Sequence, residues 1–264
     1  MHADESYLDL IRNALRVCLN YKPAFGYGSG NRITLERFQQ IYREDEFYSW
    51  FGLDSPLVYA AHKAAGGMTS VYRQIGLGCQ LLFQNILQDS LGLSPADATW
   101  SYKLKAKGTK GRTLSLDGRI PLDKITDAPA RQRCAAWLAG AIASVGLKDR
   151  SAQSLDGCVF EVRQGYKSND AKRQNADVSN AANAFAHRYL PVMLLLSVQI
   201  PVNLAERYAR AHWLILRGTV GGSAIDSTYV FCRDVLGYDL AGFFRRNSAA
   251  IKAETLAVFE GLLR

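Results

Sequence analysis

The spacing of apolar residues changes near residue 100, and this change limits the chain to folds that join a helical part to a sheet. Before residue 100, apolar side chains recur at helical spacing, most clearly over 69–91. Segments 101–107 and 113–120 instead alternate apolar and polar residues and flank a turn at 108–111. That pattern is typical of a β-hairpin with one buried and one polar face.

Helical and strand-like segments alternate after the hairpin. The expected helices are 127–145, 169–189 (ended by Pro191), 203–211 and 227–264, and the expected strands are 158–163, 192–200 and 213–217. This order predicts an α/β fold, with a mixed central β-sheet flanked by helices and a helical N-terminal part. We expect one domain, 1–264, made of a helical subdomain 1–97 and an α/β core 98–264.

Local signals divide the helical part further. Thr34 is suited to cap a helix, and Ser55 followed by Pro56 is suited to start another. The run Ala65, Gly66 and Gly67 is expected to break that second helix.

Composition excludes several classes of protein. A chain with 48% hydrophobic and 21% charged residues is not intrinsically disordered. Its longest apolar run, 192–196, is too short to cross a membrane, and the acidic N-terminus lacks a signal sequence. The five cysteines are scattered, which favours neither a disulfide framework nor a zinc site. We expect a soluble, cytoplasmic protein without a membrane partner.

Positive charge is concentrated in one part of the chain. The net charge is +8, and segment 101–175 alone holds 15 Lys and Arg against seven Asp and Glu. Concentrated basic charge attracts polyanions, so nucleic acid is the first partner to consider. A lysine-rich, solvated hairpin is the alternative interpretation.

An acidic residue inside an apolar strand needs a counter-charge or an open face. Glu161 lies between Phe160 and Val162, and the strand period of two places it on the same side as Arg163. Asp117 lies on the polar face of the preceding strand. If these strands are neighbours, the carboxylates of Asp117 and Glu161 could bind one Mg²⁺, with substrate phosphate and water completing the shell.

This order of motifs resembles the PD-(D/E)xK nuclease superfamily, particularly type II restriction endonucleases, over residues 101–200. The resembling features are an aspartate on a hairpin strand, Glu-x-basic on the next strand, a helix, and an apolar strand, together with the run 160–177. The resemblance implies a Mg²⁺-dependent, site-specific endonuclease acting on double-stranded DNA, with Asp117 and Glu161 as metal ligands. Symmetric duplex sites favour a homodimer.

Two positions depart from the superfamily pattern. Leu116, not proline, precedes Asp117, and Arg163 occupies the usual lysine position. An arginine cannot act as a general base but can neutralise a phosphorane. Lys167 could supply an amine instead, and Gln164 could orient water.

Other interpretations of the same residues stay open. Asp156 competes with Asp117 as the first acid, although it and Glu161 face opposite sides of a continuous strand. Glu161 and Arg163 could also form only a structural ion pair. Basic and amide side chains suit phosphates and base edges, and the candidate DNA-binding residues are Lys103, Lys105, Lys107, Gln164, Lys167, Asn169, Lys172, Arg173 and Asn175.

Two further functions compete with hydrolysis. One is nucleic-acid binding without cleavage, in which the basic segment acts alone. The other is small-molecule chemistry at the glycine-rich segments 26–30 and 218–222, which lack the usual partners of a phosphate site.

Overall fold

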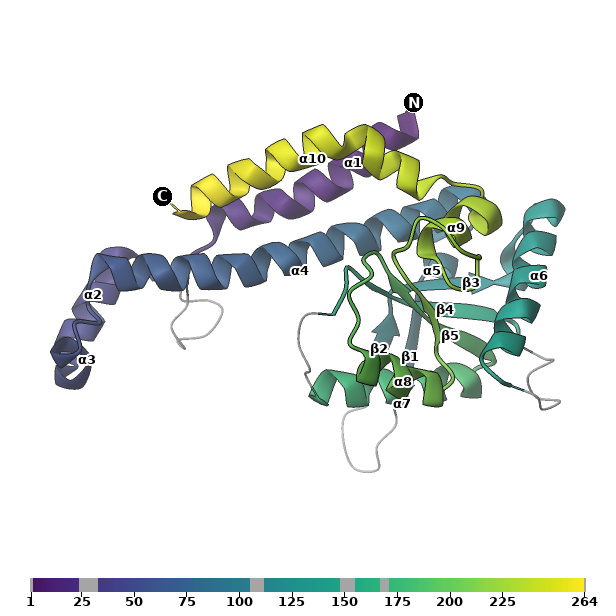
Figure 1. Cartoon of the computed structure of the whole chain (residues 1–264), viewed down its shortest axis with the longest axis horizontal. Helices are drawn as coiled ribbons and strands as arrows, with labels where there is room; N and C mark the ends of the chain where they lie inside the picture. Colours follow the sequence, from purple (N-terminus) through teal and green to yellow (C-terminus); the bar gives the residue numbers. More distant parts are fainter. Residues whose placement is uncertain (1, 24–32, 105–111, 148–154, 167–170, 264) are drawn as a thin grey trace. The chain divides into compact units, whose positions relative to one another are not determined.

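The computed structural model describes residues 2–23, 33–104, 112–147, 155–166 and 171–263 (Figure 1). Two compact units make up the chain. The first comprises Met1–Gly78 and Asn247–Arg264, and the second comprises Cys79–Arg246. This division differs from the expected subdomains 1–97 and 98–264, because the end of the chain joins the N-terminal unit and residues 79–97 join the α/β unit.

The first unit is built from helices in the part of it that the structure describes. These are α1 (His2–Arg16), the short turn η1 (Val17–Asn20), α2 (Leu35–Glu44), α3 (Glu46–Trp50), the first part of α4 (Pro56–Leu91) and most of α10 (Leu240–Leu263). The side chain of Thr34 accepts a hydrogen bond from the Arg37 amide, so the predicted cap is confirmed. A bidentate ion pair between Arg16 and Glu254, with nitrogen–oxygen distances of 2.8 and 2.9 Å, joins α1 to α10.

The predicted break at Ala65–Gly67 is wrong, because α4 is continuous through both glycines. The hydroxyl of Tyr21 lies where a Cβ of Gly66 would be, and the methyl groups of Leu262 lie 2.8–2.9 Å from a Cβ built at Gly67. Glycine is used here so that neighbouring chain segments can approach the helix closely.

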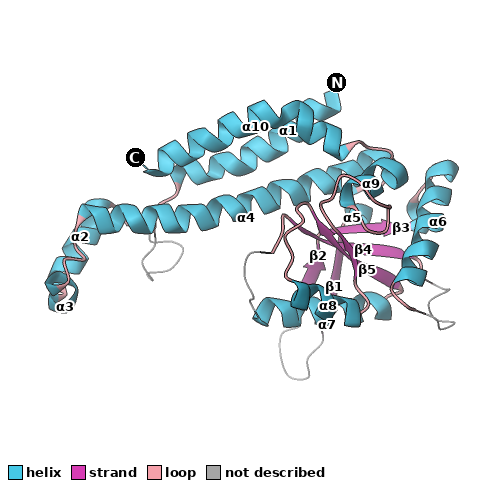
Figure 2. Ribbon diagram, in the orientation of Figure 1, coloured by secondary structure: helices cyan, strands magenta, loops and turns pink. Residues whose placement is uncertain are grey.

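The second unit combines two sheets with helices (Figure 2). Its strands are β1 (Trp100–Leu104), β2 (Arg112–Leu116), β3 (Gly118–Pro121), β4 (Gly157–Arg163), β5 (Tyr189–Leu195) and β6 (Leu214–Leu216). Its helical segments besides α4 are α5 (Pro95–Ala98), η2 (Leu122–Lys124), α6 (Ala128–Ser144), α7 (Ala171–Ala186), α8 (Val202–Arg210), α9 (Thr228–Phe231), the π-helical turn η4 (Cys232–Leu236) and the start of α10. The predicted mixed α/β architecture is therefore confirmed.

Strand pairing divides the two sheets at Asp117. Strands β1 and β2 form the expected antiparallel hairpin, with Trp100 opposite Leu116. The other sheet has the order β3-β4-β5-β6, in which β3 is antiparallel to β4 and the remaining pairs are parallel. The single strand expected over 113–120 is thus two strands, because the chain exchanges β1 for β4 as its partner at this residue.

Strand β5 begins earlier than the sequence indicates. Helix α7 ends at Ala186, and Arg188 takes a left-handed φ of 65° before the strand starts at Tyr189. Pro191 therefore lies inside β5, opposite Val159, and does not end the helix as expected. A proline has a fixed φ and no amide hydrogen to donate, so a central strand such as β5 seldom contains one.

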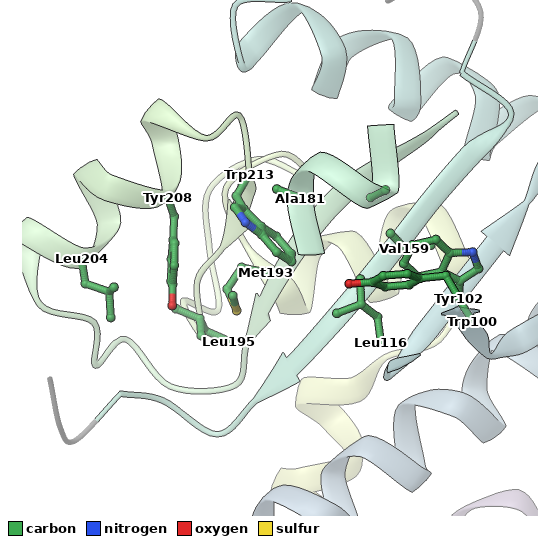
Figure 3. Packing of buried hydrophobic residues seen from close by; sticks show 11 residues of the cluster. Trp100, Tyr102, Leu116, Val159, Ala181, Met193, Leu195, Leu204, Tyr208 and Trp213 are labelled. Carbon is green, nitrogen blue, oxygen red and sulfur yellow. The ribbon is translucent and has the colours of Figure 1, made fainter. Parts of the chain in front are cut away.

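Helices cover both faces of the four-stranded sheet. On one face Val159, Met193 and Leu195 pack with Ala181 of α7 and Tyr208 of α8 (Figure 3). The hairpin adds Trp100, Tyr102 and Leu116 to this cluster.

The opposite face is lined by aromatic rings. Phe160 lies edge-on to Phe83 of α4, with ring centroids 5.0 Å apart, and 5.7 Å from Phe231 of α9. Trp137 of α6 extends this group through Phe231. Strand β4 is consequently buried on both sides, which explains its near-continuous apolar sequence.

All five cysteines are buried free thiols. Among the described residues, no helix combines the length and apolar character needed to cross a membrane.

Close approach of β3 to β4 gives a stability test. A Cβ at Gly157 would overlap the carbonyl oxygen of Ile120 and lie 3.2 Å from the Cα of Pro121. We expect Gly157→Ala to lower the free energy of unfolding by about 2–3 kcal/mol, because backbone cannot yield as a flexible side chain can. Gly140→Ala in α6 is the matched control, since a Cβ there meets nothing within 4 Å. The control should raise stability by about 0.5–1 kcal/mol. Equal denaturation midpoints for the two variants would contradict this account of the β3–β4 pairing.

Candidate active site

Strand β4 carries Glu161 and Arg163 to the sheet face covered by α7 and α8. Their register partners on β5 are Met193 and Leu195, which belong to the core cluster on that face. Only 13% of the Glu161 side chain and 7% of the Arg163 side chain are exposed. The predicted same-side placement of these residues therefore puts both charged groups in a largely buried environment.

Asp117 lies between β2 and β3, directly before Gly118 and across from Glu161. The pairs Gly118–Phe160 and Arg119–Val159 define an antiparallel register. The next position of this register places Asp117 opposite Glu161. The Asp117 amide donates to the Phe160 carbonyl at 2.8 Å, and its Oδ2 accepts from the Val162 amide at 2.8 Å. Backbone bonds on both sides thus fix this carboxylate beside β4.

Arg163 joins two carboxylates through one nitrogen. Its Nη2 lies 2.7 Å from Glu161 Oε1 and 3.0 Å from Asp177 Oδ1. The guanidinium also lies over the ring of Tyr166, 5.5 Å from its centroid. The ion pair that the alternative interpretation expects is therefore present, and it includes a third acid.

Asp177, on α7, is 2% exposed and surrounded by donors. The hydroxyl of Tyr208 donates to Asp177 Oδ2 at 2.6 Å, and the hydroxyl of Tyr166 lies 3.1 Å from Tyr208 Oη and 3.4 Å from the same carboxylate oxygen. Trp213 Nε1 donates to the Asp177 carbonyl at 3.2 Å.

Reasoning from the sequence missed Asp177, Tyr166 and Tyr208 as members of the site. The available signal was helical spacing, since Asp177 shares the buried face of α7 with Ala181 and Ala184. An acid on an apolar helix face requires a partner for the same reason that Glu161 does.

Burial dominates the protonation of these groups. It raises the pKa of Glu161 to about 8, an effect that Arg163 opposes and that Asp117 and Asp177 reinforce. Burial also raises the pKa of Asp117, although the Val162 amide and Arg163 lower it. For Arg163, burial lowers the pKa but Glu161, Tyr166 and Asp177 outweigh it, so the guanidinium stays charged. Three carboxyl groups therefore share one positive charge.

Asp156, the competing first acid, lies just before β4. It is exposed and forms an ion pair with Arg188 at 2.9 Å. Asp117, unlike Asp156, is among the groups that raise the pKa of Glu161. The structure thus brings Asp117 and Glu161 together and gives Asp156 a separate partner.

The candidate DNA-binding residues fall into three groups. Lys103 is exposed on β1, Gln164 is half-buried directly after β4, and Asn175 is exposed and accepts a hydrogen bond from Arg207. Lys172 and Arg173 lie in the first turn of α7, where only the backbone is described. The candidates outside the described residues are Lys105, Lys107, Lys167 and Asn169.

Among the residues that the structure describes, no three His, Cys, Asp or Glu side chains are arranged to hold a metal ion. The carboxylates of Asp117 and Glu161 would therefore be the two protein ligands in the coordination shell of a metal ion. That number suits Mg²⁺, which keeps water and phosphate oxygens in most of its positions.

The raised pKa of Glu161 gives a pH test. Its folded value of about 8 exceeds its ordinary value of 4.5, so the folded protein binds this proton more tightly than the unfolded chain does. This contribution to stability is complete below about pH 4.5 and is lost as the pH rises through about 8. Glu161→Gln removes the titration. Without added metal, the free energy of unfolding of the variant, relative to that of wild type, should rise by at least about 1–2 kcal/mol as the pH is raised from about 5 to about 9.

Thermal unfolding across this pH range measures the difference. Glu206→Gln is the control, because Glu206 is exposed and forms an ion pair with Arg210 on its own helix at 3.7 Å. Its stability should follow wild type throughout. Parallel pH curves for wild type and Glu161→Gln would show that the Glu161 carboxyl does not hold a proton in the folded state.

The chain was compared with protein-family models, curated proteins and solved structures, and none of the three comparisons gives a match.

Proposed function

We propose that the protein is a Mg²⁺-dependent, site-specific endonuclease that hydrolyses phosphodiester bonds in double-stranded DNA, as type II restriction enzymes do. Asp117 and Glu161 bind the metal in this proposal. The four-stranded mixed sheet with helices on both faces is compatible with the PD-(D/E)xK resemblance in the sequence. DNA in the cytoplasm would be the substrate.

The observation that carries the proposal is the charge balance of the buried site. Asp117, Glu161 and Asp177 contribute three carboxyl groups, and Arg163 contributes one positive charge. Within the part of the chain that the structure describes, full ionisation leaves two of these negative charges without a counter-ion in a largely buried environment, which is expensive. A divalent cation would supply the missing charge, and the carboxylates of Asp117 and Glu161, which the register places opposite each other, would be its ligands.

Bound Mg²⁺ would supply Lewis-acid stabilisation of the negative charge that develops on the scissile phosphate. The chain's own groups have separate tasks. The Val162 amide keeps Asp117 in place, and the ion pair with Arg163 keeps Glu161 in place. Lys167 follows β4 by four residues and is the candidate for the amine that assists the attacking water.

The basic segment 101–175 supports DNA as the substrate, because its excess of eight positive charges lies in the same part of the chain as Asp117 and Glu161. Exposed Lys103 on β1 would contact the phosphate backbone. A homodimer would provide one site for each strand of a symmetric duplex sequence.

Nucleic-acid binding without hydrolysis is the second candidate, and the ion pair between Glu161 and Arg163 favours it. That pair already gives Glu161 a cation without any metal. In this alternative the acidic cluster only stabilises the sheet, and the basic segment alone binds DNA.

Cleavage of long duplex DNA of mixed sequence tests the proposal. Wild type with Mg²⁺ should yield discrete fragments, and a chelator should prevent cleavage. Asp117→Asn and Glu161→Gln should each reduce the rate about 100-fold or more, since each removes a ligand of an ion worth several kcal/mol to the transition state. Asp156→Asn is the matched control and should cleave within about threefold of wild type, because Asp156 is exposed and forms an ion pair with Arg188.

Two results would contradict the assignment in different ways. Undiminished cleavage by Glu161→Gln would place the active site elsewhere in the chain. Salt-sensitive DNA binding without cleavage, across several divalent metals, would select the non-hydrolytic alternative.

A further inference from the structure

Arg163 is too deeply buried to meet a substrate. Its side chain is 7% exposed, and Nη2 is already committed to Glu161 at 2.7 Å and to Asp177 at 3.0 Å. A guanidinium that neutralises a phosphorane must reach the phosphate, so this side chain needs a different role.

Stability alone does not explain the arrangement. Arg163 Nε is buried and has no hydrogen-bond partner among the described residues. A buried ion-pair network with an unpaired donor is commonly less stable than an apolar packing of the same volume.

The surroundings of Arg163 hold it in one place. Asp177 Oδ1 accepts from Arg163 Nη2, and the Tyr208 hydroxyl donates to Asp177 Oδ2 at 2.6 Å. The hydroxyl of Tyr166 completes this group, at 3.1 Å from Tyr208 Oη. The chain of contacts therefore runs from α8 through α7 to β4 and ends on Glu161 Oε1.

We infer that Asp177 and Tyr208 are positioning residues, which hold Arg163 so that it orients the Glu161 carboxylate toward a divalent cation. This inference rests on the proposed function, because it assigns the groups behind one of its two metal ligands. Asp177 shares Nη2 with Glu161, so the guanidinium fixes Glu161 through one oxygen without neutralising the carboxylate completely. Groups that orient a metal-binding carboxylate commonly control metal affinity.

The removal of Asp177 has a definite consequence. In Asp177→Asn, Arg163 loses the negative charge of its second partner, which favours a closer pairing of the guanidinium with both oxygens of Glu161. Bidentate pairing is the favoured geometry of a guanidinium with a carboxylate, and it would compete with a cation. The loss of Tyr208's hydroxyl acts in the same direction but more weakly, because it loosens Asp177 without changing the charge of the site.

Binding of Mn²⁺ to the full chain tests the inference without reference to cleavage. Electron paramagnetic resonance measures free Mn²⁺ in titrations of wild type, Asp177→Asn, Tyr208→Phe, Glu161→Gln and Tyr229→Phe. Tyr229→Phe is the matched control, since the half-buried Tyr229 lies in the same unit and donates its hydroxyl to the main-chain carbonyl of Leu196 at 2.9 Å rather than to a side chain of the acidic cluster. Thermal unfolding of each variant measures the stability cost separately.

We expect Asp177→Asn to weaken Mn²⁺ binding about 10–100-fold and Tyr208→Phe to weaken it about 3–10-fold. Tyr229→Phe should bind Mn²⁺ as wild type does, even if its melting temperature falls as much as that of Tyr208→Phe. Because Tyr208→Phe leaves every charge in place, a weaker affinity in that variant separates orientation from simple loss of negative charge.

Failure of the inference and failure of the proposed function give different results. Wild-type affinity in Asp177→Asn and Tyr208→Phe, with binding lost in Glu161→Gln, would overturn the positioning role and leave the metal site standing. Equal weakening in Tyr208→Phe and Tyr229→Phe would also overturn it, because the effect would then follow stability. If wild type binds no Mn²⁺, or Glu161→Gln binds it unchanged, both the proposed metal site and this inference are wrong.

Discussion

One buried guanidinium supports the arrangement of charged groups in the α/β unit. Arg163 lies on a central strand, where it pairs with Glu161 on the same strand and Asp177 on α7. Carboxylates at these depths would be strongly unfavourable without a cation. Arg163 therefore compensates part of the charge of this polar centre, around which β4 and β5 pack with α7 and α8.

The change of strand partner at Asp117 is the second requirement of the site. The chain continues the alternating pattern of β2, yet β2 pairs with β1 whereas β3 pairs with β4. This exchange of partners sets Asp117 against Glu161, although the whole of α6 lies between them in the sequence. The Val162 amide then fixes the carboxylate. Two carboxylates in neighbouring positions suit the metal site proposed above.

Much of the local structure could be predicted from the sequence, and the failures have one cause. The sequence indicated a strand over 158–163, and the same-side placement of Glu161 and Arg163 followed from the strand period. The continuity of α4 through Gly66, the place of Pro191 inside β5 and the pairing of Asp177 could not be predicted in this way. Each depends on a neighbour distant in the sequence, such as Tyr21 beside Gly66, and local propensity contains no information about that neighbour.

The sequence by itself determined the mixed α/β class, the basic segment 101–175 and the fact that the acid in β4 needs a partner. Those properties follow from composition and from the periods of helix and strand, which act over a few residues. Only the tertiary structure decided that Asp117 rather than Asp156 lies against Glu161, and that Arg163 is shared with Asp177 and buried. Register and helix docking fix these relations, because burial makes a carboxylate depend on whichever charged groups the fold brings within a few ångströms.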